Sequence, residues 1–267
     1  MISAWLRRRR GEHHVSFRLD GPARAIFARK RDELPEQDAP LTAFDLVLCG
    51  SSVSSSLERA AVSEARAAGV RCAVWLDHWM NYPARFEELP DELWVSDEHA
   101  ERIALATVPG PPVSVRGNPY LEDAAAEIRA LETPHTGAEH VLYVSEPTSV
   151  AAERATGDPL GWGYEEHAAL RGYLEARPGP LRLRTHPAEP EGKYADLVAE
   201  YGLELSSGRT LAEDCAWADT VVGCDTMAMA VALTAGRRVV SAIPPGGRPL
   251  SLPFTEIERM FVASSGA

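Results

Sequence analysis

Short apolar runs alternate with segments of helical periodicity along the first half of the chain. After the run FDLVLCG, Leu57, Ala61 and Ala65 recur at helical spacing, and Gly69 follows as a stop signal. Short apolar strands that alternate with amphipathic helices are typical of βαβ units in a parallel sheet. The strands expected here are HVSFRL, FDLVLCG, RCAVWLD, DELWVSD and PVSVRGN, and the helices are GPARAIFARK, SSVSSSLERAAVSEARAAGV and EHAERIALAT.

The same alternation restarts after a polar segment, residues 120–137, which predicts a helix and a linker. Strands are expected at HVLYVSE, PLRLRTH, LELSS, DTVVGC and RRVVSAI, with helices at GYEEHAALRGYLEA, YADLVAEYG, LAEDCAWA and TMAMAVALTAG. The last segment, TEIERMFVA, can pack as a short helix across the domain boundary. The sequence therefore predicts two doubly wound, Rossmann-like α/β domains, residues 1–125 and 137–267. Facing each other across a cleft, they would hold a ligand beyond the carboxyl ends of their strands.

Composition narrows the class of protein. Hydrophobic residues make up 45% of the chain and charged residues 25%, which is typical of a soluble globular protein, and no apolar run approaches the ~20 residues of a membrane span. The net charge of −12 should repel nucleic acid and anionic membranes. The four cysteines have neither CxxC nor Cys/His metal spacing, and MISAWLRRRRGEHH has the wrong order for a secretory signal. We therefore expect a cytoplasmic protein that uses no metal or cofactor.

The stretch CGSSVSSSLE, residues 49–58, places a glycine and several serines where a strand ends and a helix begins. Gly50 permits a tight turn, while Ser51 and Ser52 can cap the helix and donate to a ligand oxygen. A serine-rich cap with no ligand is equally compatible with this pattern. The Gly-Lys-Ser/Thr of a Walker A loop and the GxGxxG fingerprint are both missing.

The stretch LDHWMNYPARF, residues 76–86, gathers acidic, basic and aromatic side chains directly after a buried strand. Asp77 or His78 could act as a general base on an acceptor hydroxyl, and spacing does not decide between them. Trp79 and Tyr82 offer faces on which a sugar ring could pack, and Arg85 adds a guanidinium. In the alternative interpretation, Asp77 caps the next segment and the aromatic residues close the bottom of the cleft.

Two strand ends in the second half carry further candidates. Ser145 and Glu146, in SEPTS, stand at the mouth of the second sheet. Glu146 could accept from a ribose or acceptor hydroxyl or serve as a base, unless it only faces solvent in a turn. Arg184 and His186, in RLRTHP, suit a phosphate, with a structural histidine as the alternative.

The segment DTVVGCDTMAMAVALTAG carries the sharpest signal for an anion site. A strand ends at Gly223, and Asp225, Thr226 and Met227 open a helix of small residues that can approach the sheet closely. The free N–H groups of this helix, its dipole and the Thr226 hydroxyl suit a diphosphate. Asp225 would repel an anion unless it caps the helix and points away. Arg248, in the loop PPGGRPLSLPF, can reach the cleft.

A series of motifs in a fixed order resembles the two-Rossmann glycosyltransferases of the GT-B architecture. The motifs are strand-GSS, DHWxNYxxRF, LPDELWVSDEHA, GNPYLED, SEP, GYEEHAAL, RTHP and GCDTMAMAVALTAGRRV, and they cover roughly residues 13–260. The similarity is greatest to capsule and polysaccharide glycosyltransferase-like proteins with a histidine-proline motif, which polysialyltransferases and CDP-glycerol glycerophosphotransferases share. UDP-GlcNAc 2-epimerases and UDP-sugar hydrolases are more distant relatives.

The resemblance implies roles for three groups of residues. His186, in the His-Pro motif, would contact the donor phosphate, and Asp225 with Thr226 would face the same phosphate. The first domain would supply the acceptor side and a base, at Asp77, His78 or the turn at residues 50–52. The resemblance also has two departures: the opening strand and Gly-rich loop of the first domain are missing or shortened, and residues 229–233 lack a Glu that holds the nucleotide ribose in many members.

The sequence thus predicts a glycosyltransferase-like enzyme that moves a sugar or related group from a nucleotide-activated donor to an acceptor hydroxyl or amine. No DxD-type motif is evident, so we expect it to work without a metal. Its expected partners are the donor and a small-molecule or glycan acceptor, with no nucleic acid and no membrane span. Two alternatives stay open, namely an NDP-sugar epimerase or hydrolase on the same scaffold, and a non-catalytic binding protein derived from it.

Overall fold

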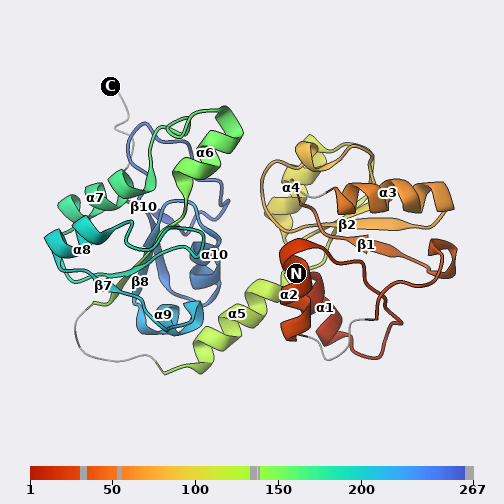
Figure 1. Ribbon diagram of the computed structural model, residues 1–267, viewed down its shortest axis with the longest axis horizontal. Helices are drawn as coiled ribbons and strands as arrows, with labels where there is room; N and C mark the ends of the chain where they lie inside the picture. The colour runs from red at the N-terminus through yellow and green to blue at the C-terminus, as the bar shows by residue number, and fades with distance from the viewer. Residues whose placement is uncertain (31–34, 53–55, 133–136, 138, 262–267) are drawn as a thin grey trace. The chain divides into compact units, whose positions relative to one another are not determined.

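The protein is described here by a computed structural model that covers residues 1–30, 35–52, 56–132, 137 and 139–261 (Figure 1). The chain divides into two compact units, Met1–Tyr120 and Leu121–Ala267. Each unit is built around one parallel β-sheet. No helix among the described residues is long and apolar enough to cross a membrane.

The first unit has a four-stranded parallel sheet in the order β1-β2-β3-β4. Its elements are α1 (Ile2–Arg8), α2 (Gly21–Lys30), η1 (Leu41–Ala43), β1 (Val47–Cys49), α3 (Leu57–Ala68), β2 (Cys72–Leu76), η2 (Pro83–Arg85), β3 (Glu92–Val95), α4 (Glu98–Thr107) and β4 (Val113–Val115). The predicted stop of α3 is present, because Gly69 adopts φ 67° and its N–H caps the helix.

Helices cover both faces of this sheet. Trp5 of α1 packs edge-on against Trp75 and Trp94, with ring centroids 6.0 and 5.4 Å apart. Strand side chains alternate between the faces, so Val74 points to the opposite side, where it lies near Val62 of α3. All five residues of β2 are buried, as expected for a strand covered on both faces.

The second unit has a six-stranded parallel sheet in the order β10-β9-β8-β5-β6-β7. Its elements are α5 (Pro119–Ala130), β5 (Val141–Val144), α6 (Thr148–Thr156), α7 (Glu166–Ala176), β6 (Arg182–Arg184), α8 (Ala195–Tyr201), β7 (Glu204–Leu205), α9 (Leu211–Trp217), β8 (Thr220–Gly223), α10 (Met227–Thr234), β9 (Arg238–Ser241) and β10 (Glu258–Arg259). Counted from β5, this is the 3-2-1-4-5-6 order of the Rossmann fold. The chain direction across the sheet reverses between β5 and β8, and such a reversal is where open α/β sheets bind their ligands.

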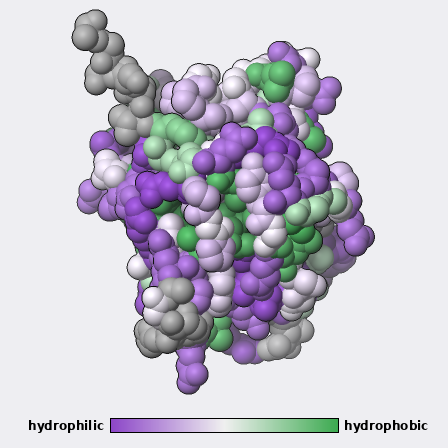
Figure 2. All heavy atoms as spheres, turned by 90° about the vertical axis from the view of Figure 1, so that its left-hand side faces the viewer, coloured by the Kyte–Doolittle hydropathy of each residue, from purple (hydrophilic) through white to green (hydrophobic). Residues whose placement is uncertain are grey.

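The two faces of this second sheet are covered by different helices. Helices α7 and α8 pack on one face, where Leu170 and Leu197 join a core cluster with Tyr143 and Val222. On the other face, Arg182 of β6 stacks on Trp217 of α9, 3.5 Å from the ring centroid. Figure 2, a view onto the side that carries α7 and α8, shows hydrophobic residues at the surface between hydrophilic ones.

The predicted α/β class, with two parallel sheets, is confirmed, whereas two local expectations are wrong and two helices, α1 and α6, were not expected. HVSFRL contributes only an isolated bridge, between Phe17 and Glu36. TEIERMFVA contains strand β10 instead of a helix, because residues 258–259 pair with β9 at the sheet edge. The N-terminal segment forms α1, which buries Leu6, while Arg8, Arg9 and Arg10 are exposed. Helix α6, directly after SEP, was not expected at all.

Candidate functional site

The point where the second sheet reverses direction brings Glu146 and Asp225 together from residues 79 positions apart in sequence. Glu146 follows β5 and Asp225 follows β8, which are neighbouring strands. The Asp225 backbone N–H donates to Glu146 Oε1 at 3.0 Å. Both residues therefore lie at the carboxyl edge of the sheet, where the fold predicts a ligand site.

The Asp225 side chain is fully buried and turned toward the loop that follows β9. Arg248 donates to its Oδ2 at 2.9 Å, and the Ser251 hydroxyl and N–H donate to Oδ1 at 2.9 and 3.1 Å. Burial raises the pKa of Asp225, while Ser251 and Arg248 act in the opposite direction. The expectation that Asp225 faces a phosphate is wrong for its carboxylate, which has its own counter-ion and does not repel an anion at the nearby helix start.

Arg248 is held in place by the segment before α7. Its guanidinium lies over the Trp162 ring, 3.5 Å from the centroid, and its backbone N–H donates to the Trp162 carbonyl at 2.9 Å. The two loops approach so closely that a Cβ on Gly163, which has φ 81°, would lie 2.3 Å from the Gly246 carbonyl oxygen. Arg248 thus lies at this edge of the sheet as the partner of Asp225, and its reach into a ligand cleft stays a prediction.

Glu146 has a perturbed pKa. Its burial, reinforced by the charge of Asp225, raises the pKa to about 7, against the lowering effects of the Asp225 N–H and Arg248. Its Oε2 atom makes no hydrogen bond among the described residues. A half-buried carboxyl group with such a pKa can give or take a proton near neutrality, which is a property of general acids and bases.

Helix α10 begins at the same edge of the sheet. Thr226, not Asp225, is its N-cap, with the hydroxyl 3.5 Å from the Ala228 N–H. Gly223 permits the close approach of the helix, because a Cβ there would lie 3.0 Å from Val144 and 3.2 Å from the Met229 sulfur. Met227, in the first turn, is half-buried. The first turn of α10 is therefore capped by the Thr226 hydroxyl and not by an acid, while Glu146 binds the Asp225 N–H just before the helix.

Ser145 and His186 lie at the ends of β5 and β6, and both contact Glu189. The Ser145 hydroxyl and the His186 N–H, the latter at 2.9 Å, donate to Glu189 Oε2. The exposed His186 ring accepts from the Ala188 N–H at Nδ1, 3.1 Å away, which leaves Nε2 as the outward nitrogen. His186 can therefore offer an Nε2–H to a ligand, whereas Ser145 is buried and positions Glu189.

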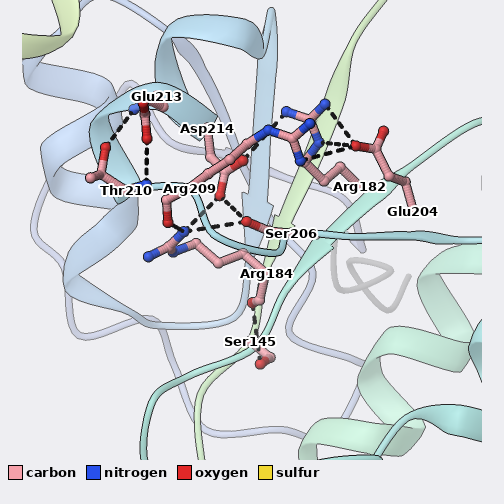
Figure 3. Close-up of polar contacts among 9 residues, drawn as sticks. All are labelled: Ser145, Arg182, Arg184, Glu204, Ser206, Arg209, Thr210, Glu213 and Asp214. Atoms are coloured by element: carbon pink, nitrogen blue, oxygen red, sulfur yellow. Dashed lines mark hydrogen bonds and ion pairs between the residues drawn. The ribbon is translucent and has the colours of Figure 1, made fainter.

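Arg184 is bound to a buried carboxylate instead of being available to a phosphate (Figure 3). Asp214 of α9, fully buried, accepts from Arg184 at 2.7 Å and from Arg182 at 3.4 Å. Arg184 also donates to the Arg209 carbonyl at 3.0 Å. The predicted phosphate contact of Arg184 is thus corrected: both arginines of RLRTHP neutralise Asp214 and fix α9 against the sheet.

In the first unit, Ser51, Asp77 and Arg85 form one polar cluster at the ends of β1 and β2. Arg85 is buried and donates to the Ser51 hydroxyl at 3.0 Å and to Asp77 Oδ1 at 3.4 Å. The Ser51 hydroxyl in turn donates to Asp77 Oδ1 at 3.2 Å. Gly50 and Ser52 are half-buried beside this cluster. Ser51 and Arg85 therefore orient Asp77, whose carboxylate remains 49% exposed.

The aromatic residues of LDHWMNYPARF have a structural role. Tyr82 is 0% exposed, and Trp79 is buried with its Nε1–H donating to Asp97 at 2.8 Å. The expectation that these rings offer faces to a sugar is wrong, since both are enclosed within the first unit. His78, next to Asp77, is half-buried.

The sequence reading missed several residues of these clusters, namely Asp97, Trp162, Glu189, Asp214 and Ser251. Asp97 alone had a local signal, because SDEHA places an acid where α4 begins, and its carboxylate caps that helix. Trp162, Asp214 and Ser251 contact partners distant in sequence, so no spacing rule could identify them, whereas Glu189 binds the His186 N–H three residues away as well as the distant Ser145. Among the described residues, no group of three or more His, Cys, Asp or Glu could hold a metal ion.

The fold is similar to that of solved proteins. No protein-family model and no curated protein matches the sequence. The crystal structure of Anabaena HepE in complex with UDP matches with a TM-score of 0.58 and 11% identity, over 90% of this chain and 75% of that one. A putative UDP-N-acetylglucosamine 2-epimerase from Listeria monocytogenes matches with a TM-score of 0.47 and 16% identity, over 74% of this chain and 57% of that one. The β-Kdo 2,7 transferase of KpsC from Thermosulfurimonas dismutans matches with a TM-score of 0.40 and 15% identity, over 82% of this chain and 84% of that one. The predicted likeness to GT-B glycosyltransferase-like proteins is confirmed at the level of the fold.

Proposed function

We propose that the protein is a glycosyltransferase that binds a nucleotide-activated sugar in its second unit and transfers the sugar, or a related group, to an acceptor hydroxyl or amine. The observation that carries this proposal is the reversal of strand order between β5 and β8, with α10 beginning at that point. The shared fold with HepE, which was solved with UDP, supports a nucleotide diphosphate as the anion.

The local charges fit a diphosphate at the start of α10. Its first amides and the positive end of its dipole attract an anion. Asp225, the nearest acid in sequence, is neutralised by Arg248 and held away by Ser251, so it does not oppose binding. His186 Nε2 offers a further donor from the neighbouring part of the same sheet edge. The sequence has no DxD motif, which is consistent with these groups, in place of a metal ion, stabilising the charge of the diphosphate.

The transfer also needs a group that takes the proton of the acceptor. Asp77, oriented by Ser51 and Arg85, and the adjacent His78 are the candidates in the first unit. Glu146, whose pKa is raised to about 7, is the candidate in the second. Replacing the true base should abolish transfer and leave nucleotide binding intact.

A charge placed in the first turn of α10 tests the phosphate site. Ala228→Asp adds an acid where the helix dipole favours one, so the fold should be at least as stable as in the wild type. The same carboxylate should repel a diphosphate and weaken UDP binding by at least about tenfold, on the basis of 1.4 kcal/mol per decade. Ala228→Asn, which has the same shape and no charge, is the matched control.

Isothermal titration with UDP provides the measurement. Binding to the wild type and to Ala228→Asn, with loss in Ala228→Asp, supports the site. If UDP, CDP, CMP and GDP all fail to bind the wild type at millimolar concentration, the proposal is wrong. Equal UDP affinity of the two variants would refute the assignment of the phosphates to α10.

One observation favours a second candidate, an epimerase or hydrolase that acts on the donor sugar itself. Such chemistry needs an acid or base at the sugar, and Glu146 stands beside α10 with a pKa of about 7 and one unpartnered oxygen. NMR of a UDP-sugar incubated without acceptor separates the two candidates. An epimer or free sugar that disappears in Glu146→Gln supports the second candidate, and an unchanged donor supports the first.

A further inference from the structure

A cavity of about 480 Å³ lies in the second unit at the amino ends of its strands. It is lined at the starts of β5, β8 and β9, by Val141, Thr220 and Arg238, and by residues just before β6. In a parallel sheet all amino ends share one edge, so this cavity and Glu146 lie at opposite edges, roughly 10 Å of strand apart. Its volume is in the range of small-molecule sites, and we call it the strand-start cavity.

The strand-start cavity has an apolar floor. Tyr173 and Leu181 belong to the buried core cluster between the sheet and α7, and Val141 and Met260 pack against that cluster. Burial, with the nearby charge of Glu139, raises the pKa of Tyr173, so its hydroxyl stays protonated and can donate. This hydroxyl makes no hydrogen bond among the described residues, although its ring is almost fully buried.

The rim of the cavity carries three arginines and two acids. Arg238 is bound to Glu258 through two hydrogen bonds of 2.8 and 2.6 Å, and it lies 3.6 Å from Glu139. Arg177 and Arg259 also line the cavity, and neither guanidinium group makes a hydrogen bond or ion pair with another described residue, although the charge of Arg177 helps to lower the pKa of Glu258. The rim therefore has a net positive charge, in a chain whose net charge is −12.

We propose that the strand-start cavity binds a small organic anion, with an apolar body on the floor and one carboxylate or sulfonate between Arg177 and Arg259. Guanidinium groups bind planar and tetrahedral oxyanions through paired hydrogen bonds. Arg238 cannot serve in the same way, because Glu258 already occupies its donors. The site is separate from the proposed phosphate site at α10, so it does not depend on the proposed function.

A pair of fluorescent probes tests this proposal. 8-Anilinonaphthalene-1-sulfonate has an aromatic body and one sulfonate, and N-phenyl-1-naphthylamine has the same body without the charge. Arg177→Glu and Arg259→Glu should each weaken binding of the sulfonate probe by at least about fivefold and leave the neutral probe within about twofold, because a repulsive charge replaces an attractive one. Both residues are exposed, so the fold should survive, as circular dichroism can check.

Arg154→Glu, on the exposed surface of α6 and outside the cavity, is the matched control for net charge. Sulfonate binding that Arg154→Glu leaves unchanged, and that saturating UDP does not displace, supports the strand-start cavity. Equal loss of both probes, an equal effect of Arg154→Glu, competition by UDP, or no binding of the sulfonate probe up to its solubility would each overturn the proposal. If inorganic phosphate at the concentration of the sulfonate probe displaces that probe, the ligand needs no apolar body and this part of the proposal is wrong.

Discussion

Glu146 should make the stability of the second unit depend on pH, and Glu146→Gln should remove that dependence. The carboxyl group has an ordinary pKa of 4.5 in the unfolded chain and about 7 in the folded protein. An acid with a raised folded pKa holds its proton more tightly in the folded state, so the free energy of unfolding falls as pH rises from 4.5 to about 7.

The size of the effect follows from the two pKa values. At 1.36 kcal/mol per pKa unit, the difference between 4.5 and about 7 gives roughly 3.4 kcal/mol as an upper limit. Glu146 is only half-buried, and screening by solvent reduces this to roughly 1.5–3 kcal/mol. Glutamine keeps an oxygen that can accept the Asp225 N–H, so the hydrogen bond at 3.0 Å should survive the substitution.

Urea unfolding at pH 5, 6, 7 and 8 measures the effect. Relative to the wild type, Glu146→Gln should gain roughly 1.5–2.5 kcal/mol of stability between pH 5 and pH 8, because part of the effect lies below pH 5. Glu153→Gln, at an exposed position of α6, should follow the wild-type curve at every pH. If the curves of Glu146→Gln and the wild type run parallel, Glu146 has an ordinary pKa and its assignment as a neutral-pH acid or base is wrong.

Two further predictions concern contacts that hold the second unit together. Asp214→Ala should lower the free energy of unfolding by about 3–5 kcal/mol, because it removes the buried carboxylate that pairs with both Arg182 and Arg184. Glu204→Gln, at a partner of Arg182 that is 49% exposed, should cost less than about 1 kcal/mol, and similar losses of the two variants in urea would contradict this account. Gly163→Ala should cost at least about 2 kcal/mol in thermal unfolding, since its Cβ would clash with the opposing loop, whereas Gly172→Ala, in open space within α7, should stabilise by up to about 1 kcal/mol; a neutral Gly163→Ala would refute the close approach.

Local patterns of the sequence determine much of the fold. The alternation of apolar runs with helical spacing predicted strands β1 to β9 and most helices, because a buried parallel strand must be apolar on both faces and a covering helix on only one. Gly69 stops α3 as predicted, since only glycine readily adopts its positive φ. The position of Glu146 and Asp225 at one edge of the second sheet also followed from sequence, because parallel strands bring their carboxyl ends to one edge.

Only the tertiary structure decided which side chains bind each other and which are buried. Nothing in the spacing of Asp225, Arg248 and Ser251 shows that they bind each other, because strand order and two loops from distant segments bring them together. The sequence suggested that Tyr82 offers its ring to a sugar, but the structure shows that this side chain is fully buried. A local pattern determines which backbone conformation a segment prefers, but whether a side chain meets solvent, a ligand or a counter-ion depends on what the rest of the chain places over it.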